Sequence, residues 1–365
     1  MSQSLKMDLK KRKIIYLATQ SEWGGAQEYI YNLAVNLDKS RFEVLILAGE
    51  GNGELFLELD KAGIRRQKLK SLKRDINPVF DVLALFELIS VFKKEKPDVI
   101  HLNSSKVGFL GSLAGKLLGK QQLVIYTAHG WVFNEPLPFF TKYLYFLIEK
   151  ISAGWKNIII TLSAKDEQIA KKHSFKSKVV TIANAINLPT LNFLNKEQAR
   201  NYLKLNQNGL IVGTIANLYP TKGLGCLIEA SKLLPNCTFT IIGEGPERPR
   251  LERMIKNHGL ESRVILTGFI PQAHCYLKAF DCFVLPSVKE GMPYVILKAI
   301  AVGLPVVATR VGGLPEIVDN NFLVEPAQPK ALAEKITEVL NKEVKQNHSL
   351  PSFNEFLGKT FGLYN

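Results

Sequence analysis

The sequence is short of the features that mark several large classes of protein. It has four cysteines in 365 residues, Cys226, Cys237, Cys275 and Cys282, and none of them stand at the short spacing of a zinc ligand pair. Neither a disulfide framework nor a zinc site is therefore expected. No apolar run approaches the roughly 18–20 residues that a membrane-spanning helix needs. Residues 1–13 are polar and basic and lack the apolar centre of a signal peptide, so we expect a cytoplasmic protein.

Two further absences concern ligands. No Asp-x-Asp pair occurs, so the sequence offers no paired carboxylates for a divalent cation, and neither a metal nor another cofactor is expected. The densest basic tract is only four residues long, Lys10 to Lys13, and basic residues are not interleaved with aromatic ones as in a single-strand binder. We therefore attribute the net charge of +14 to anionic substrates or an anionic membrane surface rather than to nucleic acid.

Length and pattern predict two domains of the α/β class. A single core stops growing at about 250–300 residues, and this chain is longer. Short apolar runs alternate with helical patterns in both halves, which predicts parallel sheets with helices on both faces and ligands at the carboxyl ends of the strands. A polar stretch that ends near Asn195 marks the boundary. We expect domains at 1–190 and 191–345, with 346–365 forming a helix that crosses back onto the first domain.

The most informative stretch, 289–309, predicts a loop, a helix and a strand. Gly291 and Pro293 favour a helix start. The first N–H groups of such a helix have no partner within it and carry the positive end of its dipole, so they suit an anion or sugar hydroxyls. Glu290 is the acidic group beside them. The alternative is an ordinary helix that packs on its sheet and leaves Lys298 in solvent.

Other motifs fall at the expected ends of strands. Gly24 and Gly25 stand between the first strand and the first helix, where glycine permits close backbone approach. His129 follows the apolar run 123–128, although a histidine in such a place is usually a packing or capping residue. Lys222 stands beside a glycine before a helix, where its charge suits a phosphate. Each motif is weak evidence when taken singly.

In their order along the chain, these motifs resemble those of the retaining glycosyltransferases of family 4. The resemblance extends from about residue 13 to residue 364. It implies a GT-B fold, in which two Rossmann-like, doubly wound parallel-sheet domains face a central cleft, with the acceptor on the first domain and the donor on the second. It also implies metal-independent transfer of a sugar from a nucleotide diphosphate sugar, above all a UDP-sugar, to a glycan or lipid-linked acceptor in cell-envelope polysaccharide synthesis.

The resemblance assigns roles to individual residues. It implies that His129 reaches the donor sugar, that Lys222 binds the diphosphate and that Glu290 lines the sugar, and we expect these three to be catalytic. The expected donor-binding residues are Gly24, Gly25, Asn217, Gly243, Gly245, Ile270, Gly291, Met292, Pro293, Tyr294 and Lys298.

Three departures from the family pattern leave an alternative open. Lys298 stands where a second glutamate is usual, Asn217 replaces an arginine of many members, and the loop after Asp319 is short. A relative that binds sugar nucleotide or glycan without efficient turnover would fit these changes. An epimerase of similar architecture would need further carboxylates that the sequence does not place.

The aromatic and basic run 139–150 has two interpretations. It fits a core helix that covers the first sheet, and it also fits a segment that docks on anionic lipid headgroups. The second interpretation predicts peripheral attachment to the inner face of the cell membrane.

Overall fold

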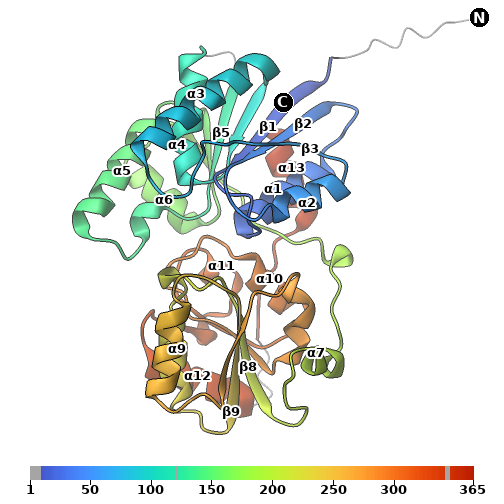
Figure 1. Ribbon diagram of the computed structural model, residues 1–365, viewed down its shortest axis with the longest axis vertical. Coiled ribbons are helices and arrows are strands. Elements are labelled where there is room, and N and C mark those ends of the chain that lie inside the picture. Colours follow the sequence, from blue (N-terminus) through green and yellow to red (C-terminus); the bar gives the residue numbers. More distant parts are fainter. Residues whose placement is uncertain (1–9, 120–121, 342–345) are drawn as a thin grey trace, which may run out of the picture. The chain divides into compact units, whose positions relative to one another are not determined.

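The computed structural model describes residues 10–119, 122–341 and 346–365. The chain divides into two compact units, each with its own parallel sheet. The first unit comprises residues 1–133, 138–182 and 357–365, and the second comprises 134–137 and 183–356. Residues 357–365 therefore belong to the same unit as the first half of the chain. The predicted α/β class with two parallel sheets is confirmed (Figure 1).

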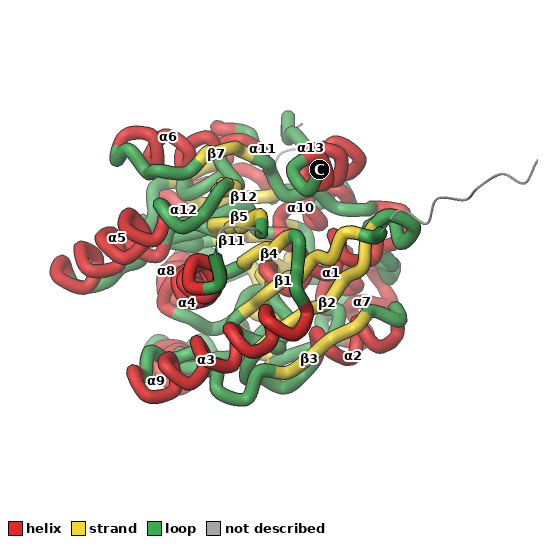
Figure 2. Tube along the Cα trace, turned by 90° about the horizontal axis from the view of Figure 1, so that it is seen from above, coloured by secondary structure: helices red, strands yellow, loops and turns green. Residues whose placement is uncertain are grey.

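The first unit contains a seven-stranded sheet in the order β3-β2-β1-β4-β5-β6-β7, and every recorded pair is parallel. Its strands are β1 (Arg12–Ala18), β2 (Phe42–Ala48), β3 (Arg65–Lys68), β4 (Val99–Leu102), β5 (Leu123–Ala128), β6 (Ile158–Thr161) and β7 (Lys178–Thr181). Its helices are α1 (Gly25–Asn36), α2 (Glu54–Lys61), α3 (Pro78–Glu95), α4 (Ser105–Leu117), α5 (Phe139–Ala153) and α6 (Ala164–Lys172), with a 3-10 turn η1 (Val132–Asn134). Figure 2 shows β3, β2, β1, β4 and β5 side by side.

The second unit contains a six-stranded sheet in the order β10-β9-β8-β11-β12-β13, again parallel. Its strands are β8 (Leu210–Ile215), β9 (Cys237–Ile242), β10 (Val264–Gly268), β11 (Cys282–Leu285), β12 (Val306–Thr309) and β13 (Leu323–Val324). The helices after Ile182 are α7 (Lys196–Tyr202), α8 (Leu224–Ser231), α9 (Arg248–Asn257), α10 (Tyr294–Ala301), α11 (Leu314–Ile317), α12 (Pro329–Asn341) and α13 (Phe353–Gly362). The 3-10 turns are η2 (Leu188–Thr190), η3 (Pro220–Lys222), η4 (Ala273–Ala279) and η5 (Asn320–Phe322).

Local sequence explains where these elements begin. The strands β1 and β6 contain continuous apolar runs, 14–18 and 158–160, because a parallel sheet is covered on both faces, and Ile14 and Ile159 are fully buried. Ser163 is the N-cap residue of α6, and its side chain accepts a hydrogen bond from the backbone of Asp166. Helix α10 begins at Tyr294, three residues later than the sequence suggested, because the backbone before it is extended up to Pro293.

Chain order reverses at one point in each sheet, between β1 and β4 in the first unit and between β8 and β11 in the second. In an open parallel sheet, ligands bind at the carboxyl ends of the strands that flank such a point. The loops that follow these four strands are therefore the natural places for a site. Within the described residues, no helix combines the length and the apolar character needed to cross a bilayer.

Candidate active site

Two charged side chains meet at the reversal point of the second sheet. Lys222 ends η3, directly after β8, and Glu290 lies in the loop after β11. The lysine Nζ lies 2.7 Å from Glu290 Oε1, and Ser287 Oγ donates to the same oxygen over 2.6 Å. The glutamate side chain is 7% exposed and that of the lysine 24%. The pair is thus shielded on the glutamate side and open to a ligand on the lysine side.

Backbone contacts fix the loops that carry this pair. Val288 N–H donates to the carbonyl of Thr221 over 2.8 Å, which joins the loops after β8 and β11. The loop after β12 is joined to the loop after β11 by Gly313, whose N–H donates to the carbonyl of Gly291 over 2.7 Å. The loop that carries Glu290 is therefore bonded to the loops on both sides of it.

Glycines allow these loops to approach so closely. Gly223 has φ 62°, and a Cβ atom there would lie 2.1 Å from the carbonyl oxygen of Pro286. A Cβ atom on Gly312 would lie 2.0 Å from the carbonyl oxygen of Glu290. Any side chain at either position would push apart the loops that hold the ion pair. Gly312 was not among the residues predicted from sequence, because its role depends on a contact with a loop 22 residues away.

The predicted glycines of the loop after β9 have a packing role. A Cβ atom on Gly243 would lie 2.0 Å from the carbonyl oxygen of Ala216, and one on Gly245 would lie 2.6 Å from that of Leu218. The loops after β8 and β9 are therefore in close contact. Asn217 lies between the two carbonyl groups and is half-buried.

The start of α10 is buried and anchored. Met292 and Tyr294 are 2% and 3% exposed, and Gly291 is buried beside them. Pro293 is the N-cap residue. Asn184 Nδ2 donates to the carbonyl of Met292 over 2.7 Å, a contact that sequence reasoning missed. The structure thus brings the loops with Lys222, Gly243 and Glu290 to one edge of the sheet.

Ile270 is farther from the ion pair. It follows β10, the outermost strand on its side, and is half-buried. Two strands, β9 and β8, separate β10 from β11, so Ile270 belongs to the periphery of the same edge.

Lys298 is not in solvent, contrary to the simpler sequence interpretation. It lies one turn into α10 and is only 6% exposed, because that face of the helix packs toward η4. Burial, and to a lesser extent the charge of Lys298, lowers the pKa of His274 in η4 to about 4. The lysine is therefore a buried positive charge close to the segment that follows β10.

In the first unit, Gly24 and Gly25 lie at the reversal point, after β1. Gly24 is the N-cap residue of α1, with extended backbone. A Cβ atom on Gly24 would lie 3.1 Å from Gln27 Oε1, whereas one on Gly25 would have nothing within 4 Å. Packing within the protein does not require glycine at position 25, which leaves open space at the start of the helix.

His129 follows β5 in the same unit. Its ring stands edge-on to the ring of Tyr29, with 5.1 Å between centroids, and the residue is half-buried. Gly130, directly after it, has φ 94°, a backbone conformation that glycine adopts without strain. The histidine is thus held at the carboxyl edge of the first sheet by an aromatic neighbour and a sharp turn.

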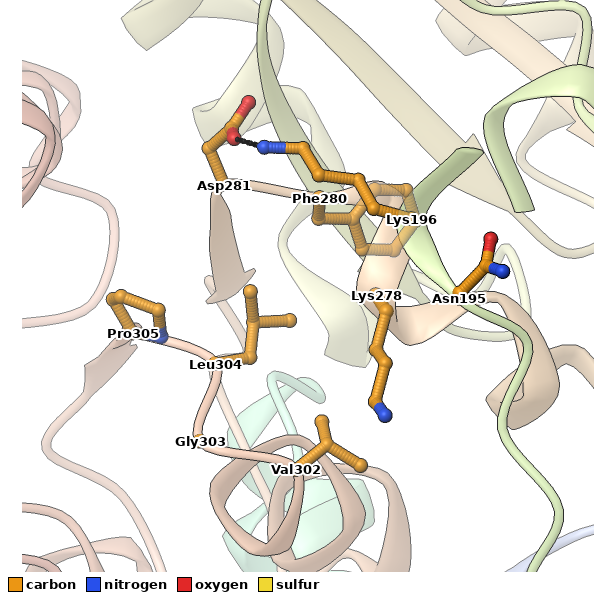
Figure 3. Close-up of a pocket in the computed structure, with 9 residues that line it drawn as sticks. All are labelled: Asn195, Lys196, Lys278, Phe280, Asp281, Val302, Gly303, Leu304 and Pro305. Carbon is orange, nitrogen blue, oxygen red and sulfur yellow. Dashed lines mark hydrogen bonds and ion pairs between the residues drawn. The ribbon is translucent and has the colours of Figure 1, made fainter. Parts of the chain in front are cut away.

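A hollow of about 420 Å³ lies elsewhere in the second unit (Figure 3). It is lined in part by Lys278, Asp281 and Pro305. Because Asp281 and Pro305 precede β11 and β12, the hollow lies at the amino edge of the sheet, opposite the ion pair. Lys196 Nζ lies 2.6 Å from Asp281 Oδ1. These residues take no part in the candidate site.

Within the described ranges, no cluster of three or more His, Cys, Asp or Glu side chains is placed to hold a metal ion. All four cysteines lie in that part of the chain and are free thiols.

Comparison with known families matches nearly the whole chain. Residues 23–189 match the family model described as Glycosyltransferase Family 4. Residues 195–352 match the family model described as Glycosyl transferases group 1.

Individual proteins that resemble this chain are also glycosyltransferases. The chain is 30% identical over 331 residues to the UDP-Gal:alpha-D-GlcNAc-diphosphoundecaprenol alpha-1,3-galactosyltransferase of Escherichia coli, covering 87% of this chain and 84% of that one. It is 26% identical to the capsular polysaccharide biosynthesis glycosyltransferase CapM of Staphylococcus aureus, over 92% and 89% of the two chains. Among solved structures, HepE of Anabaena in complex with UDP and glucose superposes with a TM-score of 0.77 at 21% identity, covering 91% of this chain and 90% of that one.

Proposed function

Since the chain belongs to the glycosyltransferases of group 1 and family 4 and its two Rossmann-like units have the GT-B fold, we propose that it transfers a hexosyl group from a UDP-sugar. The proposed acceptor is a glycan or a lipid-linked saccharide of the cell envelope. The transfer proceeds with retention of configuration and without a metal ion. The observation that carries the proposal is the Lys222–Glu290 pair at the reversal point of the second sheet.

The proposed donor site places positive charge where the leaving group becomes negative. Lys222 offers three N–H donors, only one of which is needed for Glu290, so it can also bind a diphosphate oxygen. The N-terminal turns of α8 and α10 add their backbone N–H groups and dipoles. Such groups stabilise charge that develops in the transition state.

Glu290 binds the donor sugar in this proposal. Both of its recorded hydrogen bonds, from Lys222 and Ser287, end on Oε1. A carboxylate has about four acceptor positions, so Oε2 keeps the capacity to accept from a sugar hydroxyl. When the diphosphate draws Lys222 toward itself, Glu290 stays anchored by Ser287 and remains oriented.

The reaction needs no protein nucleophile in this scheme. The bond between the anomeric carbon and the diphosphate oxygen breaks, and the acceptor oxygen bonds to the same face of that carbon. The acceptor proton passes to the departing diphosphate. We assign to His129 a hydrogen bond to the donor sugar that fixes its orientation, since the histidine stands at a strand end and is held by Tyr29.

A donor panel tests the reaction. The protein is incubated with UDP-, GDP- and ADP-sugars and a membrane extract, and both released nucleotide diphosphate and glycosylated product are measured. We expect UDP release that depends on the extract. A preference for GDP- or ADP-sugars would refute the donor assignment.

Binding without efficient turnover is the second candidate, and the buried Lys298 favours it. A cation at this position can only donate hydrogen bonds, whereas a glutamate accepts them from ribose hydroxyls. If UDP binds but no nucleotide is released with any donor and extract, this second function replaces the first.

We also propose that the first unit attaches to the inner face of the membrane. Large apolar side chains are exposed on α3 and α5, two helices that both pack against α4 (Figure 1). We call this set the apolar helix surface: Val79, Phe80, Leu83 and Phe86 of α3, with Phe139, Phe140, Tyr143 and Leu144 of α5. Phe139 and Phe140 are 75% and 83% exposed, so the core-helix interpretation of 139–150 holds for only one face of α5.

Charge points to an anionic bilayer as the occupant of this surface. The first unit has 29 Lys and Arg against 17 Asp and Glu, a net charge of +12, whereas the second has 18 against 16, a net charge of +2. Lysines lie beside this surface or on the same helix, since Lys73 Nζ is 5.7 Å from the ring centroid of Phe80 and Lys150 of α5 is exposed. Apolar residues with lysines beside them suit the boundary between acyl chains and anionic headgroups.

Vesicle flotation tests the attachment. We expect binding to vesicles rich in phosphatidylglycerol, weak binding to phosphatidylcholine vesicles, and loss of binding in high salt because salt screens the lysines. Phe139→Ser with Phe140→Ser should weaken binding at least about tenfold. Leu57→Ser is the matched control, because Leu57 is also in the first unit and 60% exposed but lies on α2. Equal binding to neutral vesicles, or equal effects of the two variants, would refute this attachment.

A further inference from the structure

A tyrosine that follows α13 is buried in the first unit. Tyr364 is fully buried there. Its hydroxyl lies 2.8 Å from His101 Nδ1 on β4 and 2.9 Å from the hydroxyl of Tyr16 on β1. All three residues belong to the first unit, so these contacts lie inside one compact body.

The hydrogen bonds continue from His101 toward the carboxyl edge of the sheet. His101 Nε2 lies 2.7 Å from the hydroxyl of Thr127, and the hydroxyl of Tyr29 lies 3.2 Å from that same Thr127 hydroxyl. The ring of Tyr29 in turn packs against the ring of His129. A continuous series of contacts therefore links Tyr364 to His129 through His101, Thr127 and Tyr29.

The donor and acceptor roles around His101 are constrained. Burial, and to a lesser extent the charge of His129, lowers the pKa of His101 to about 3, so its ring is neutral at physiological pH. A neutral imidazole has one donor nitrogen and one acceptor nitrogen. Tyr364 and Thr127 must consequently play opposite roles toward His101, and removing the Tyr364 hydroxyl leaves one buried ring nitrogen without its partner.

We propose that Tyr364 is a positioning residue for His129. The phenol, brought to the first unit by the last helix of the chain, completes the hydrogen bonds that fix His101 and Thr127. Thr127 then fixes the Tyr29 ring against which His129 packs. The proposal rests on the assigned role of His129 in sugar transfer, and it gives the C-terminal residues a part in that role.

The test compares two phenylalanine variants that each remove one buried phenol. Tyr364→Phe breaks the series, because it removes the bond to His101. Tyr16→Phe removes the bond to Tyr364 but leaves every link from Tyr364 to His129 in place, and Tyr16 is equally buried. Both variants therefore lose the bond between Tyr16 and Tyr364, and they differ in the bond to His101, which only Tyr364→Phe removes.

We expect Tyr364→Phe to lower kcat by about ten- to a hundredfold with an unchanged KM for the donor, since misplacement of a reacting group affects the transition state most. Tyr16→Phe should retain kcat within about twofold. Equal losses of kcat in the two variants, matched by equal losses of melting temperature, would overturn the positioning role.

A second measurement does not depend on turnover. With histidine labelled for NMR, the ring resonances of His129 should shift and broaden in Tyr364→Phe and stay in place in Tyr16→Phe. An unchanged His129 signal in Tyr364→Phe would refute the inference even if the protein transferred no sugar, whereas an inactive wild-type protein with a shifted signal would refute the transfer role alone.

Discussion

The Lys222–Glu290 pair shows what single residues contribute and what sequence can predict of them. Each residue is predictable separately from its place at a strand end. Their direct contact is not, because the residues lie 68 positions apart and meet only through the adjacency of β8 and β11. Ser287 is missed for a related reason: a serine after a strand is too common to indicate that its hydroxyl reaches a buried carboxylate.

Removing Lys222 should impair transfer more than stability. We expect Lys222→Ala to lower kcat/KM by at least about 30-fold, or about 2 kcal/mol, because a charged hydrogen bond to the diphosphate is lost. Steady-state kinetics with a UDP-sugar measure this effect.

Lys232→Ala is the matched control for Lys222→Ala. Lys232 also pairs with a glutamate of the second unit, Glu229, but that pair is exposed, so kinetics should not change. A similar loss of kcat/KM in both variants would indicate a general effect of charge and contradict the assigned role of Lys222.

Lys298 offers a test of the departure from the family pattern. We expect Lys298→Glu to tighten UDP binding by about 1–2 kcal/mol, because a carboxylate there can accept from the ribose hydroxyls. Calorimetry with UDP measures the change. Weaker binding by the variant would show that the lysine serves the diphosphate instead. The pKa of His274 provides a structural check, since it should rise once the positive charge beside it is replaced.

At the scale of elements, sequence predicts the strands well and the exposure of helices poorly. Strand runs such as 158–160 are apolar throughout because both faces of a parallel sheet are covered. Helices α3 and α5 are rich in apolar residues on more than one face, and sequence does not show which face meets the sheet. Only the structure separates the buried Ala153 from the exposed Phe140 of α5.

The stability of the first unit should decrease in acid because of His101. This histidine lies on β4 and contacts Tyr364, which follows α13. The pKa of His101 is about 3 in the folded unit, against an ordinary value of 6.5 for a histidine in water, so between these values the unfolded chain binds a proton that the folded unit does not. The free energy of unfolding should therefore fall as pH falls below 6.5, by up to about 1.4 kcal/mol per pH unit. Urea denaturation at pH 7, 6 and 5 measures this slope.

His101→Gln separates this contribution from others. Burial also lowers the pKa of His274 and His348 in the second unit, and both add to the slope. The variant should be less stable at pH 7, because a buried hydrogen-bonded group is lost, yet lose less stability on acidification. An unchanged slope would mean that the pKa of His101 is the same in the folded protein as in the unfolded chain, and it would contradict the prediction.

At the scale of the molecule, the two units differ in net charge. Nearly all of the net charge lies in the first unit, a distribution that the sequence total of +14 conceals. The chain also passes from the second unit to the first after Phe356, and Tyr364 is buried in the first unit. Sequence indicates a terminal helix from its apolar spacing but gives no sign that a tyrosine beyond that helix bonds a histidine on β4.

Because the second unit is close to neutral overall, the negative charge on a leaving diphosphate has to be balanced by positive groups beside it. Lys222 and the N-terminal turns of α8 and α10 supply that charge in the proposed mechanism, which leaves no step for a divalent cation. Turnover should therefore be unchanged when EDTA is added to protein and donor, with initial rates of UDP release as the measurement. Lys222→Ala provides the sharper comparison: if its lost activity is not recovered by magnesium or manganese, the lysine does not merely support a metal site. Loss of wild-type activity in EDTA, followed by recovery when either ion is restored in excess, would contradict metal independence and require a cation at the diphosphate.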